Sequence, residues 1–600
     1  MRISMDYSVK IGGAAGQGIQ TIGESLARVF SRSGYNLFSY QDYESRVRGG
    51  HNSFQIRFAD QIVLAPRDPI EILIALDGES IPLHGNELSD IGSAIYDSED
   101  LGQKYDDPRF VDVPFKRIAR ESGGSEIMAN TVASAAVLGM LGIDVSLLED
   151  VLRDTLEKHP ETIDTNIKVA RAGHEYGKSH CPRCTFAVVP SSGRKMVIEG
   201  NQAIGLAAIA SGCRFYAAYP MTPSTGIFVF MAGHAERHGI VVEQAEDEIA
   251  AINMTLGASF AGVRAMTGTS GGGFALMVEG LSLAGMTETP VVMVLAQRPG
   301  PATGLPTRTE QADLLYALYA GHGEVPRILF APGTPQQAFK LVNKAFDLTE
   351  KYQVPAIILT DQLYADATWS IDDIDLEQFR YTDYRLRGDD FKSLQEYKRH
   401  DFTESGVSPL AVPGDAPHVV VTDSDEHDEA GHLVEDAPTR IKMVEKRYLR
   451  KMPLIRREIE PPVLYGNASP ELLLVGWGSN YGVMKEAVDA LAGRRNVAML
   501  HFTELFPFPD TEMPPTVQPA DAGREAVKAG AYAASGGTPP GFLDLMKSAD
   551  RAICIENNVS GEFATLVRAE TGFEFRDRIN KYDGRAFSLE GLLEEIDVYL

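Results

Sequence analysis

The chain has 600 residues, of which 44% are hydrophobic, and a formal net charge of −27. A chain of this length buries a sizeable core and is expected to divide into three or four domains. The negative charge disfavours nucleic acid and anionic membranes as partners, and the apolar runs are far shorter than the roughly 18 residues of a membrane-spanning helix. Because the N-terminal segment lacks an apolar signal region and there are only four cysteines, we expect a cytoplasmic protein without a disulfide framework.

Apolar β-rich runs alternate with helical patterns, which predicts a multidomain α/β protein built on parallel sheets. The first block opens with a strand at Tyr7–Ile11, a glycine loop and a helix through Phe30. The predicted domains and connections are residues 1–180, 181–195 (a linker), 196–370, 371–460 (an extended connection) and 461–600. Further strands are predicted at Arg214–Ala218, Val263–Met266, Val291–Ala296, Ala356–Leu359, Leu472–Gly478, Val497–Phe502 and Ala552–Glu556, with a helix at Tyr481–Ala492 and a loop at Val517–Gly541.

The motif YPMTPST (Tyr219–Thr225) directly follows one predicted strand. Thr222 before Pro223 is typical of an N-cap with proline at the first helical position. A second interpretation is that the hydroxyl and the free amides at the carboxyl end of a parallel strand face a ligand. The motif alone does not decide between a helix start and a binding site.

An acidic trio opens the helical pattern EDEIAAINMTLGA (Glu246–Ala258). Ile249, Ile252 and Leu256 follow a spacing of three to four residues, which predicts a buried stripe with Glu248 beside it. The same acids also favour a helix N-terminus through its dipole. The glycines of TGTSGGG (Thr267–Gly273), which come next, indicate either a close approach of the backbone to another group or a bare turn.

Together these motifs resemble the pyrimidine-binding domain of thiamine diphosphate enzymes, specifically the 2-oxoacid:ferredoxin oxidoreductases. The resemblance is carried by YPMTPST, EDEIAAINMTLGASFAG, TGTSGGGFALM and QRPGPATGLPTRTEQAD (Gln297–Asp313). The first block resembles the family's gamma subunit through GGAAGQGIQT (Gly12–Thr21) and ESRVRGGHNSFQIR (Glu44–Arg57). The rest resembles its alpha subunit, so we expect a gamma–alpha fusion. The segment QRPGPATGLPT is most similar to the corresponding segment of members that act on 2-oxoglutarate.

The resemblance implies oxidative decarboxylation of a 2-oxoacid, with the acyl group passing to coenzyme A and the electrons to ferredoxin. For 2-oxoglutarate the product is succinyl-CoA, and the reverse reaction is a reductive carboxylation. Glu248 would hydrogen-bond N1′ of the aminopyrimidine, since a glutamate in an apolar pocket can share a proton with a weakly basic ring nitrogen. The other cofactor contacts that the resemblance implies are Tyr219, Pro220, Thr269, Ser270 and Gly271.

Four residues are implied substrate contacts. Thr222 would contact the carbonyl end of the substrate or the edge of the cofactor. Arg298 would hold the substrate carboxylate, because a guanidinium binds a carboxylate with two hydrogen bonds. Thr307 would line the same pocket. Arg308 is a candidate for the second carboxylate of 2-oxoglutarate, and a surface arginine is the alternative.

Coenzyme A has weaker candidates. The glycine loop with Gly16 and Gly18 follows a strand and opens a helix, which suits a phosphate group, and Arg46 and Arg48 are candidates beside it. His427 and Asp428 lie in the acidic run DSDEHDEAGH (Asp423–His432), whose similar stretches in the family lie near the active site; a solvated loop is the alternative.

No resident metal site is predicted for this chain, because CPRC (Cys181–Cys184) would need two more suitably placed thiolates and only the isolated Cys213 and Cys554 remain. The sequence also lacks a GDG motif with a following Asn, which normally holds pyrophosphate and Mg²⁺. The resemblance therefore implies a beta subunit that supplies Mg²⁺, the pyrophosphate half of the site and an iron–sulfur cluster, in a dimer of heterodimers. Ferredoxin would dock on that partner. The third block resembles the structural C-terminal domain of transketolase-like enzymes.

Two alternatives stay open beside other 2-oxoacid substrates such as pyruvate or branched-chain 2-oxoacids. One is a 2-oxoacid dehydrogenase subunit that passes the acyl group to a lipoyl lysine. The other is a non-catalytic scaffold whose glycine loop binds a dinucleotide and whose Glu248 only favours a helix start.

Overall fold

The computed structural model describes residues 5–45, 49–181, 183–186, 188, 193–375, 377, 379, 381–394, 396–415, 417–517 and 540–600. Helices surround three mixed sheets, two of them mainly parallel and the eight-stranded one with a parallel and an antiparallel part, which confirms the predicted α/β class. Arg46 and Arg48 lie outside the described residues, as does most of the predicted loop Val517–Gly541. The chain forms two compact units, one of Met1–Glu199, Ala367–Ile374 and Phe587–Leu600, the other of Gly200–Asp366 and Asp375–Ala586.

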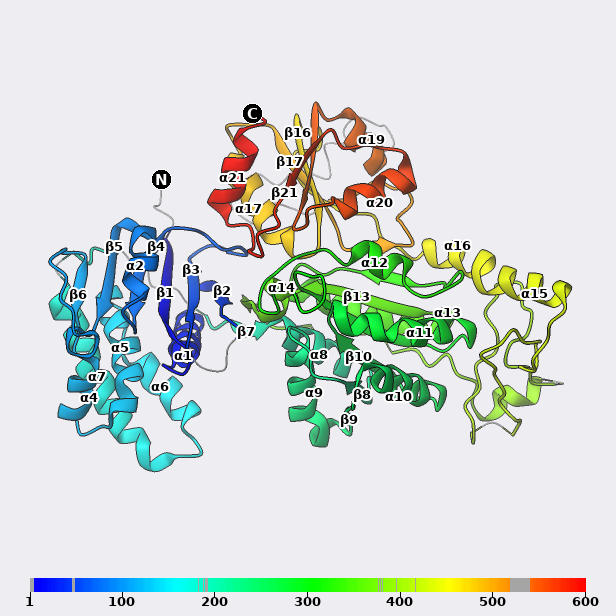
Figure 1. Ribbon diagram of the computed structural model, residues 1–600, viewed down its shortest axis with the longest axis horizontal. Helices are drawn as coiled ribbons and strands as arrows, with labels where there is room; N and C mark the ends of the chain where they lie inside the picture. Colours follow the sequence, from blue (N-terminus) through cyan, green and yellow to red (C-terminus); the bar gives the residue numbers. More distant parts are fainter. Residues whose placement is uncertain are drawn as a thin grey trace. The chain divides into compact units, whose positions relative to one another are not determined.

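The first unit contains an eight-stranded sheet in the order β6-β5-β4-β1-β3-β2-β14-β7 (Figure 1). Its elements are β1 (Asp6–Ala14), α1 (Ile19–Arg32), β2 (Asn36–Asp42), β3 (His51–Ala59), β4 (Ile70–Ala75), α2 (Ser80–His84), β5 (Leu88–Tyr96), α3 (Ser98–Leu101), β6 (Phe110–Asp112), α4 (Phe115–Glu121), α5 (Ala129–Leu141), α6 (Ser146–Thr155), α7 (Ile163–His180), β7 (Met196–Glu199), β14 (Thr368–Ile371) and α21 (Leu589–Asp597). Strands β1, β4, β5 and β6 are parallel, so the loops that follow them meet at one edge. The main core packs α1, α5, α6 and α7 on one face of this sheet.

The second unit begins with a seven-stranded sheet in the order β18-β12-β13-β11-β10-β8-β9. Its elements are α8 (Gly200–Ala210), β8 (Phe215–Ala218), α9 (Thr225–His238), β9 (Val241–Gln244), α10 (Glu248–Phe260), β10 (Ala265–Thr269), α11 (Gly271–Met286), β11 (Val291–Gln297), α12 (Leu314–Tyr319), β12 (Ile328–Phe330), α13 (Pro335–Tyr352), β13 (Pro355–Asp361), α14 (Gln362–Asp366) and β18 (Glu504–Phe506). All its neighbouring strands are parallel except β12 with β18. Val291, Met293 and Leu295 of β11 share one core with residues of α10 and α11.

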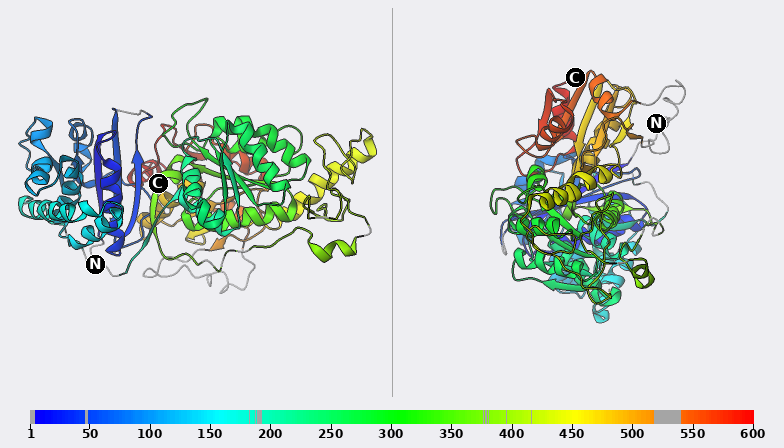
Figure 2. Two further views of the ribbon diagram at one scale, coloured as in Figure 1. Left: turned by 90° about the horizontal axis from the view of Figure 1, so that it is seen from below. Right: turned by 90° about the vertical axis from the view of Figure 1, so that its right-hand side faces the viewer.

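The rest of this unit is a helical run and a six-stranded sheet in the order β19-β15-β17-β16-β20-β21. Its elements are α15 (Ala437–Val444), a π-helical turn (Glu445–Arg450), α16 (Lys451–Arg456), β15 (Val463–Gly466), β16 (Leu472–Trp477), α17 (Tyr481–Leu491), β17 (Val497–Phe502), β19 (Thr516–Val517), α19 (Phe542–Ser548), β20 (Arg551–Glu556), α20 (Glu562–Thr571) and β21 (Asp577–Asn580). Helix α15, the π-helical turn and α16 follow one another without a break (Figure 2). One continuous core joins this sheet to α10, α11 and β11.

Three local expectations around the motifs differ from the structure. Helix α9 begins at Thr225 with Ser224 as its N-cap, so Thr222 and Pro223 precede the helix and leave the Thr222 side chain outside it. Ile249 is 48% exposed, whereas Ile252 and Leu256 are buried as predicted. The glycines Gly271–Gly273 form the first turn of α11 and are not a bare turn.

Cysteine pairing also differs from the expectation. Cys181 and Cys184 form a disulfide, a bond that the sequence analysis did not anticipate, while Cys213 and Cys554 are buried thiols. Within the described ranges, no group of three or more His, Cys, Asp or Glu side chains is placed to hold a metal ion. The helices in those ranges are all too short or too polar to cross a membrane.

Candidate active site

Most of the predicted site residues follow the carboxyl ends of neighbouring parallel strands in the second unit. YPMTPST comes after β8, Glu248 follows the short loop after β9, Ser270 comes after β10, and Arg298 comes after β11. In an open parallel sheet this edge is where ligands bind. The topology therefore places YPMTPST and Arg298, which are about eighty residues apart in the sequence, at the same edge of the sheet.

Two acidic residues at the start of α10 have different environments. The Asp247 side chain is the N-cap and accepts a hydrogen bond of 2.7 Å from the backbone amide of Ala250. Glu248 is only 3% exposed, and its Oε1 has no hydrogen-bond partner among the described residues. A buried carboxylate oxygen without a partner is costly unless a ligand supplies the donor. The cap is thus Asp247, and Glu248 is left for another function.

The start of α11 lies directly against this carboxylate. A Cβ atom at Gly273 would lie 2.8 Å from the Glu248 carboxyl carbon, and nearer still to Glu248 Oε1 and Thr269 Oγ1. Only a glycine therefore fits there without a shift of its neighbours. The buried Ser270 hydroxyl, at the N-cap of α11, also has no partner within the described part of the chain. Glu248 Oε1, from the start of α10, and the Ser270 hydroxyl, at the start of α11, are thus two buried polar atoms without a partner in the described residues.

Thr222 and Arg298 are in direct contact. Arg298 Nη1 donates a hydrogen bond of 2.7 Å to the Thr222 carbonyl oxygen. Burial lowers the pKa of the Arg298 guanidinium, while the nearby Asp313 carboxylate acts in the opposite direction. Tyr219 is 40% exposed and Pro220 is half-buried, at the end of β8. The structure thus joins the two predicted substrate residues, although through the backbone of Thr222.

Asp313 is a neighbour of this site that sequence reasoning missed, although it ends the quoted run Gln297–Asp313. A Cβ atom at Gly271 would lie 2.6 Å from Asp313 Oδ2, so the carboxylate lies against the start of α11. Burial, reinforced by Glu310 and opposed by Arg298, raises the pKa of Asp313 to about 6. Proximity to the glycine start of α11 appears only in three dimensions, and no spacing in the sequence indicates it.

Thr307 and Arg308 occupy the loop between β11 and α12. Thr307 is buried, in agreement with a residue that lines a pocket. Arg308 is half-buried, and a Cβ atom at Gly584 would lie 3.3 Å from the Arg308 Cβ. The prediction that these two residues contact a substrate stays a prediction.

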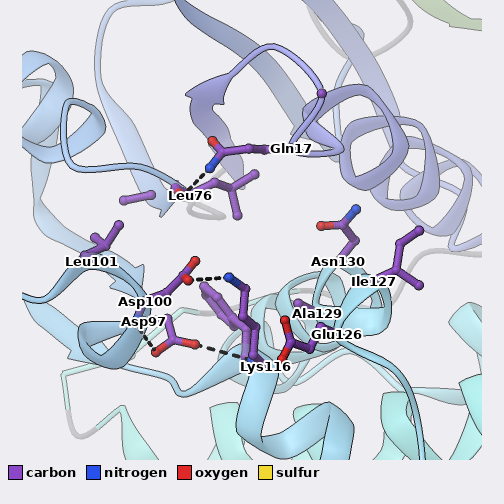
Figure 3. Close-up of a pocket in the computed structure, with 13 residues that line it drawn as sticks. Gln17, Leu76, Asp97, Asp100, Leu101, Lys116, Glu126, Ile127, Ala129 and Asn130 are labelled. Carbon is purple, nitrogen blue, oxygen red and sulfur yellow. Dashed lines mark hydrogen bonds and ion pairs between the residues drawn. The ribbon is translucent and has the colours of Figure 1, made fainter. Parts of the chain in front are cut away.

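The glycine loop of the first unit borders two cavities. Gly16 and Gln17 line a cavity of about 210 Å³ that is shown in Figure 3, and Gly16 and Gly18 line a second cavity of about 490 Å³ beside α1, α5 and α6. Gly18 is the N-cap of α1 and has a φ of +84°, and a Cβ atom there would lie 2.8 Å from Asn130 Cγ. The loop therefore borders space for a ligand, and the prediction that the helix start binds a phosphate group stays a prediction.

The walls of the first cavity are acidic. Asp97, Asp100 and Glu126 line it, and its one lysine, Lys116, pairs with Asp100 (Figure 3). Carboxylates repel a phosphate and suit hydroxyl or amino groups. A phosphate at the start of α1 therefore fits the second cavity better than the first.

Asp428 and His427 have local roles. Asp428 Oδ1 accepts hydrogen bonds from the amides of Ala430 and His432, at 2.9 and 3.0 Å, which closes its own loop. His427 is fully buried rather than solvated. Its ring lies at a tilt to that of His400, with ring centroids 4.0 Å apart. The assignment of Asp428 to coenzyme A stays untested.

The buried Glu248 carboxylate at the start of α10 thus lies against the glycine-rich start of α11, and its Oε1 has no partner among the described residues. The family described as "Pyruvate flavodoxin/ferredoxin oxidoreductase, thiamine diP-bdg" matches residues 206–446, and "Pyruvate ferredoxin/flavodoxin oxidoreductase" matches residues 8–176. The 2-oxoacid:ferredoxin oxidoreductase subunit alpha of a Sulfolobus species is 31% identical, over 99% of this chain and 96% of that protein. The chain therefore belongs to the 2-oxoacid:ferredoxin oxidoreductase family.

Two further relatives bear on the substrate. The 2-oxoglutarate oxidoreductase subunit KorA of Mycobacterium tuberculosis is 29% identical, over 84% of this chain and 82% of that protein. A solved structure of 2-oxoglutarate:ferredoxin oxidoreductase from Magnetococcus marinus, with 2-oxoglutarate, coenzyme A and succinyl-CoA bound, is 28% identical. It has a TM-score of 0.86 and is matched over 99% of both chains. The expected α/β fold with a thiamine diphosphate-binding domain is confirmed.

Proposed function

We propose that this chain is the gamma-fused alpha subunit of a cytoplasmic 2-oxoglutarate:ferredoxin oxidoreductase. The enzyme converts 2-oxoglutarate and coenzyme A to succinyl-CoA and CO2 and passes two electrons to ferredoxin, and the reaction can run in reverse. The observation that carries the proposal is the buried Glu248 carboxylate, whose Oε1 has no partner among the described residues. The 2-oxoglutarate relatives and the motif QRPGPATGLPT support the choice of substrate.

The residues at the start of α11 fit the aminopyrimidine ring of thiamine diphosphate. Glu248 Oε1 offers an acceptor for a protonated ring nitrogen, and the Ser270 hydroxyl offers a second polar contact. The glycine at position 273 allows a close approach to the carboxylate. When bound, the cofactor supplies a carbon nucleophile for the 2-oxo carbonyl and an electron sink for the loss of CO2.

The roles of the chain's own residues follow from their positions. Glu248 holds and returns a proton at Oε1, in a site from which water is largely excluded. Arg298 uses one N–H on the Thr222 carbonyl and has four others, which can bind a substrate carboxylate. Thr222 is thereby held next to that carboxylate. Arg308 remains the candidate for the second carboxylate of 2-oxoglutarate.

The other half of the site belongs to a partner subunit. The sequence contains no pyrophosphate motif, and of its four cysteines two are paired and two are buried. Next to Glu248, helices α10 and α11 leave Ile249, Met254 and Leu276 40 to 48% exposed. These apolar side chains would gain from burial against a partner chain. A beta subunit on this face would complete the site with Mg²⁺ and an iron–sulfur cluster and would receive ferredoxin.

Coenzyme A is proposed to bind at the glycine loop of the first unit, with a phosphate group at the start of α1. The cavity of about 490 Å³ that Gly16 and Gly18 border supports this proposal. The cavity has the size of ordinary small-molecule sites, which are roughly 300 to 1,000 Å³.

Substitution of Glu248 tests the proposal. The chain is co-purified with the beta subunit encoded beside it, and coenzyme A-dependent viologen reduction is measured with 2-oxoglutarate, pyruvate and branched-chain 2-oxoacids. Glu248→Gln is expected to lose about 10²- to 10⁴-fold in turnover, as for loss of a proton-transfer group, with assembly intact. Glu246→Gln, at an exposed position two residues away, is the control. Unchanged turnover in Glu248→Gln would favour the scaffold alternative. Turnover of pyruvate alone would refute the proposal that 2-oxoglutarate is the substrate.

A further inference from the structure

A cluster of buried cations packs around the C-terminal end of α11, at the opposite end of this helix from Glu248. Lys446 and Lys451, from the π-helical turn and α16, both form ion pairs with Glu288. The side chains of both lysines are completely buried, and that of Glu288 is 1% exposed. His400 Nδ1 lies 3.0 Å from the same carboxylate. One buried carboxylate thus faces two ammonium groups.

A second carboxylate beside it is shared in the same way. Glu426 accepts hydrogen bonds from Arg440 Nη1 at 2.6 Å and from Arg447 Nη2 at 2.8 and 2.9 Å. The Arg447 side chain is 7% exposed, whereas that of Arg440 is 49% exposed. Four cations in this region therefore share two carboxylates.

Two further buried cations are accounted for by helix ends. Arg399 donates to the Glu288 carbonyl at 2.7 Å, just past the end of α11. Arg327 donates to the carbonyls of Ala317 and Ala320 at the end of α12, at 2.8 and 2.6 Å. These carbonyls carry partial negative charge, and their hydrogen bonds compensate Arg399 and Arg327 themselves. The same carbonyls do not neutralise Lys446, Lys451, Arg440 or Arg447.

Loss of a proton removes only part of the excess. Burial lowers the pKa of Lys446 to about 7, so this lysine is neutral in part of the population at neutral pH. Lys451 and the two arginines then still outnumber the two carboxylates. The cation in excess is Arg440, whose side chain is 49% exposed and shares the Glu426 carboxylate with the buried Arg447. Both guanidinium groups therefore keep N–H groups that can bind an anion.

A cavity of about 70 Å³ lies beside the arginines. Its lining includes Arg440 and Arg447, together with Ser282, His322, Tyr448 and the exposed Glu324. Arg447 Nη1 is buried and has no hydrogen-bond partner in the described part of the chain. One water needs roughly 10 to 15 Å³, so the cavity has room for several waters or for one tetrahedral oxyanion.

We infer that this cavity binds a small tetrahedral oxyanion, with inorganic phosphate as the representative ligand, held by Arg440 and Arg447. Guanidinium groups bind such oxyanions with paired, charge-assisted hydrogen bonds. The site is separate from the cofactor site, because α11 has 16 residues and a helix of this length spans about 24 Å. The inference does not depend on the proposed function.

Isothermal titration of the assembled complex with inorganic phosphate tests the inference, with potassium chloride at equal ionic strength as the blank. The wild type is expected to show saturable binding. Arg440→Gln is expected to bind about 10-fold more weakly or worse, because a hydrogen bond to a charged group contributes about one decade of affinity. Lys442→Gln removes an exposed charge from the same helix without touching the cavity and should bind like the wild type.

Two outcomes would overturn the inference. One is an absence of saturable binding to the wild type, and the other is equal binding to the wild type and Arg440→Gln. Arg440→Lys is the control for a folding defect. It keeps the positive charge and loses only the paired N–H donors of the guanidinium group. Its affinity should lie between those of the wild type and Arg440→Gln. AMP, which carries the same phosphate on a nucleoside, is too large for the cavity and should bind more weakly than inorganic phosphate.

Discussion

Replacement of Gly273 by alanine tests the packing of α11 against the Glu248 carboxylate. The new Cβ atom would lie 2.8 Å from the carboxyl carbon, against the 3.4 Å at which ordinary contact begins, and Oε1 is nearer still. The carboxylate oxygen must therefore move by roughly 1 Å, and a misplacement of that size costs about 10²-fold in rate. Since alanine has the higher helix propensity, the helix itself should form as well as before.

The assay is coenzyme A-dependent viologen reduction by the assembled complex, with gel filtration and thermal unfolding as checks of assembly and fold. Gly233→Ala is the matched control, because Gly233 lies within the neighbouring helix α9 and its Cβ atom would meet nothing within 4 Å. We expect Gly233→Ala to keep full activity and Gly273→Ala to lose about 99% of it. Equal activity of the two folded variants would show that the position of Glu248 does not limit the reaction.

Three further predictions concern pH, buried charge and coenzyme A. Burial raises the pKa of Asp313 from 3.8 to about 6, so the folded state binds a proton that the unfolded chain has lost, and stability falls by about 3 kcal/mol as the pH rises from about 4 to 6. Asp313→Asn should remove this loss in thermal unfolding measured at pH 4 and 7.5; an unchanged pH dependence would refute the shift. Glu288→Gln strands two buried lysines and should cost about 3 to 5 kcal/mol in urea unfolding, whereas the exposed Glu279→Gln should change stability by less than about 0.5 kcal/mol; similar losses would contradict the ion network. Gly18→Ala should raise the KM for coenzyme A and leave the KM for 2-oxoglutarate unchanged. Gly142→Ala is the control for backbone strain, because Gly142 has a similar φ and a Cβ atom there would meet open space. Equal KM values for coenzyme A in the two variants would argue against coenzyme A binding at the glycine loop.

Most strands of the second unit could be predicted from the sequence because they are short apolar runs between polar segments. The strand predicted at Val497–Phe502 is β17 with the same bounds, and that predicted at Val291–Ala296 is one residue shorter than β11. Such runs are buried on both faces, so their apolar character is continuous and easy to detect. The strand predicted at Val263–Met266 is shifted in β10, which reaches Thr269, because its polar residues are also buried.

Local rules for helix starts were less reliable near the site. Thr222 followed by Pro223 satisfies the rule for an N-cap, yet Ser224 is the N-cap of α9. Ile249 satisfies the helical spacing of a buried stripe, yet it is exposed. Both residues lie at the edge that is proposed to face the cofactor and the partner subunit. Functional sites are where local preferences and the final structure are expected to disagree.

The residues that sequence reasoning missed depend on contacts between distant segments. Glu288 pairs with lysines 158 and 163 residues further along the chain, and no periodicity indicates such a pair. Asp313 meets Gly271 only because the loop after β11 returns to the start of α11. By contrast, Glu248 could be identified from its motif, and the structure adds that its Oε1 is buried and free of partners in the described residues.

Exchange of the C2 proton of thiamine diphosphate, followed by NMR in D₂O on the assembled complex, reports the activation of the cofactor without the later steps. The proton that Glu248 shares with the aminopyrimidine ring is expected to promote this exchange. If Glu248 shares a proton with the aminopyrimidine ring, Glu248→Gln should slow this exchange by about 10²- to 10⁴-fold while the cofactor stays bound. Glu246→Gln should exchange at the wild-type rate. A wild-type exchange rate in the cofactor-bound Glu248→Gln complex would contradict the account.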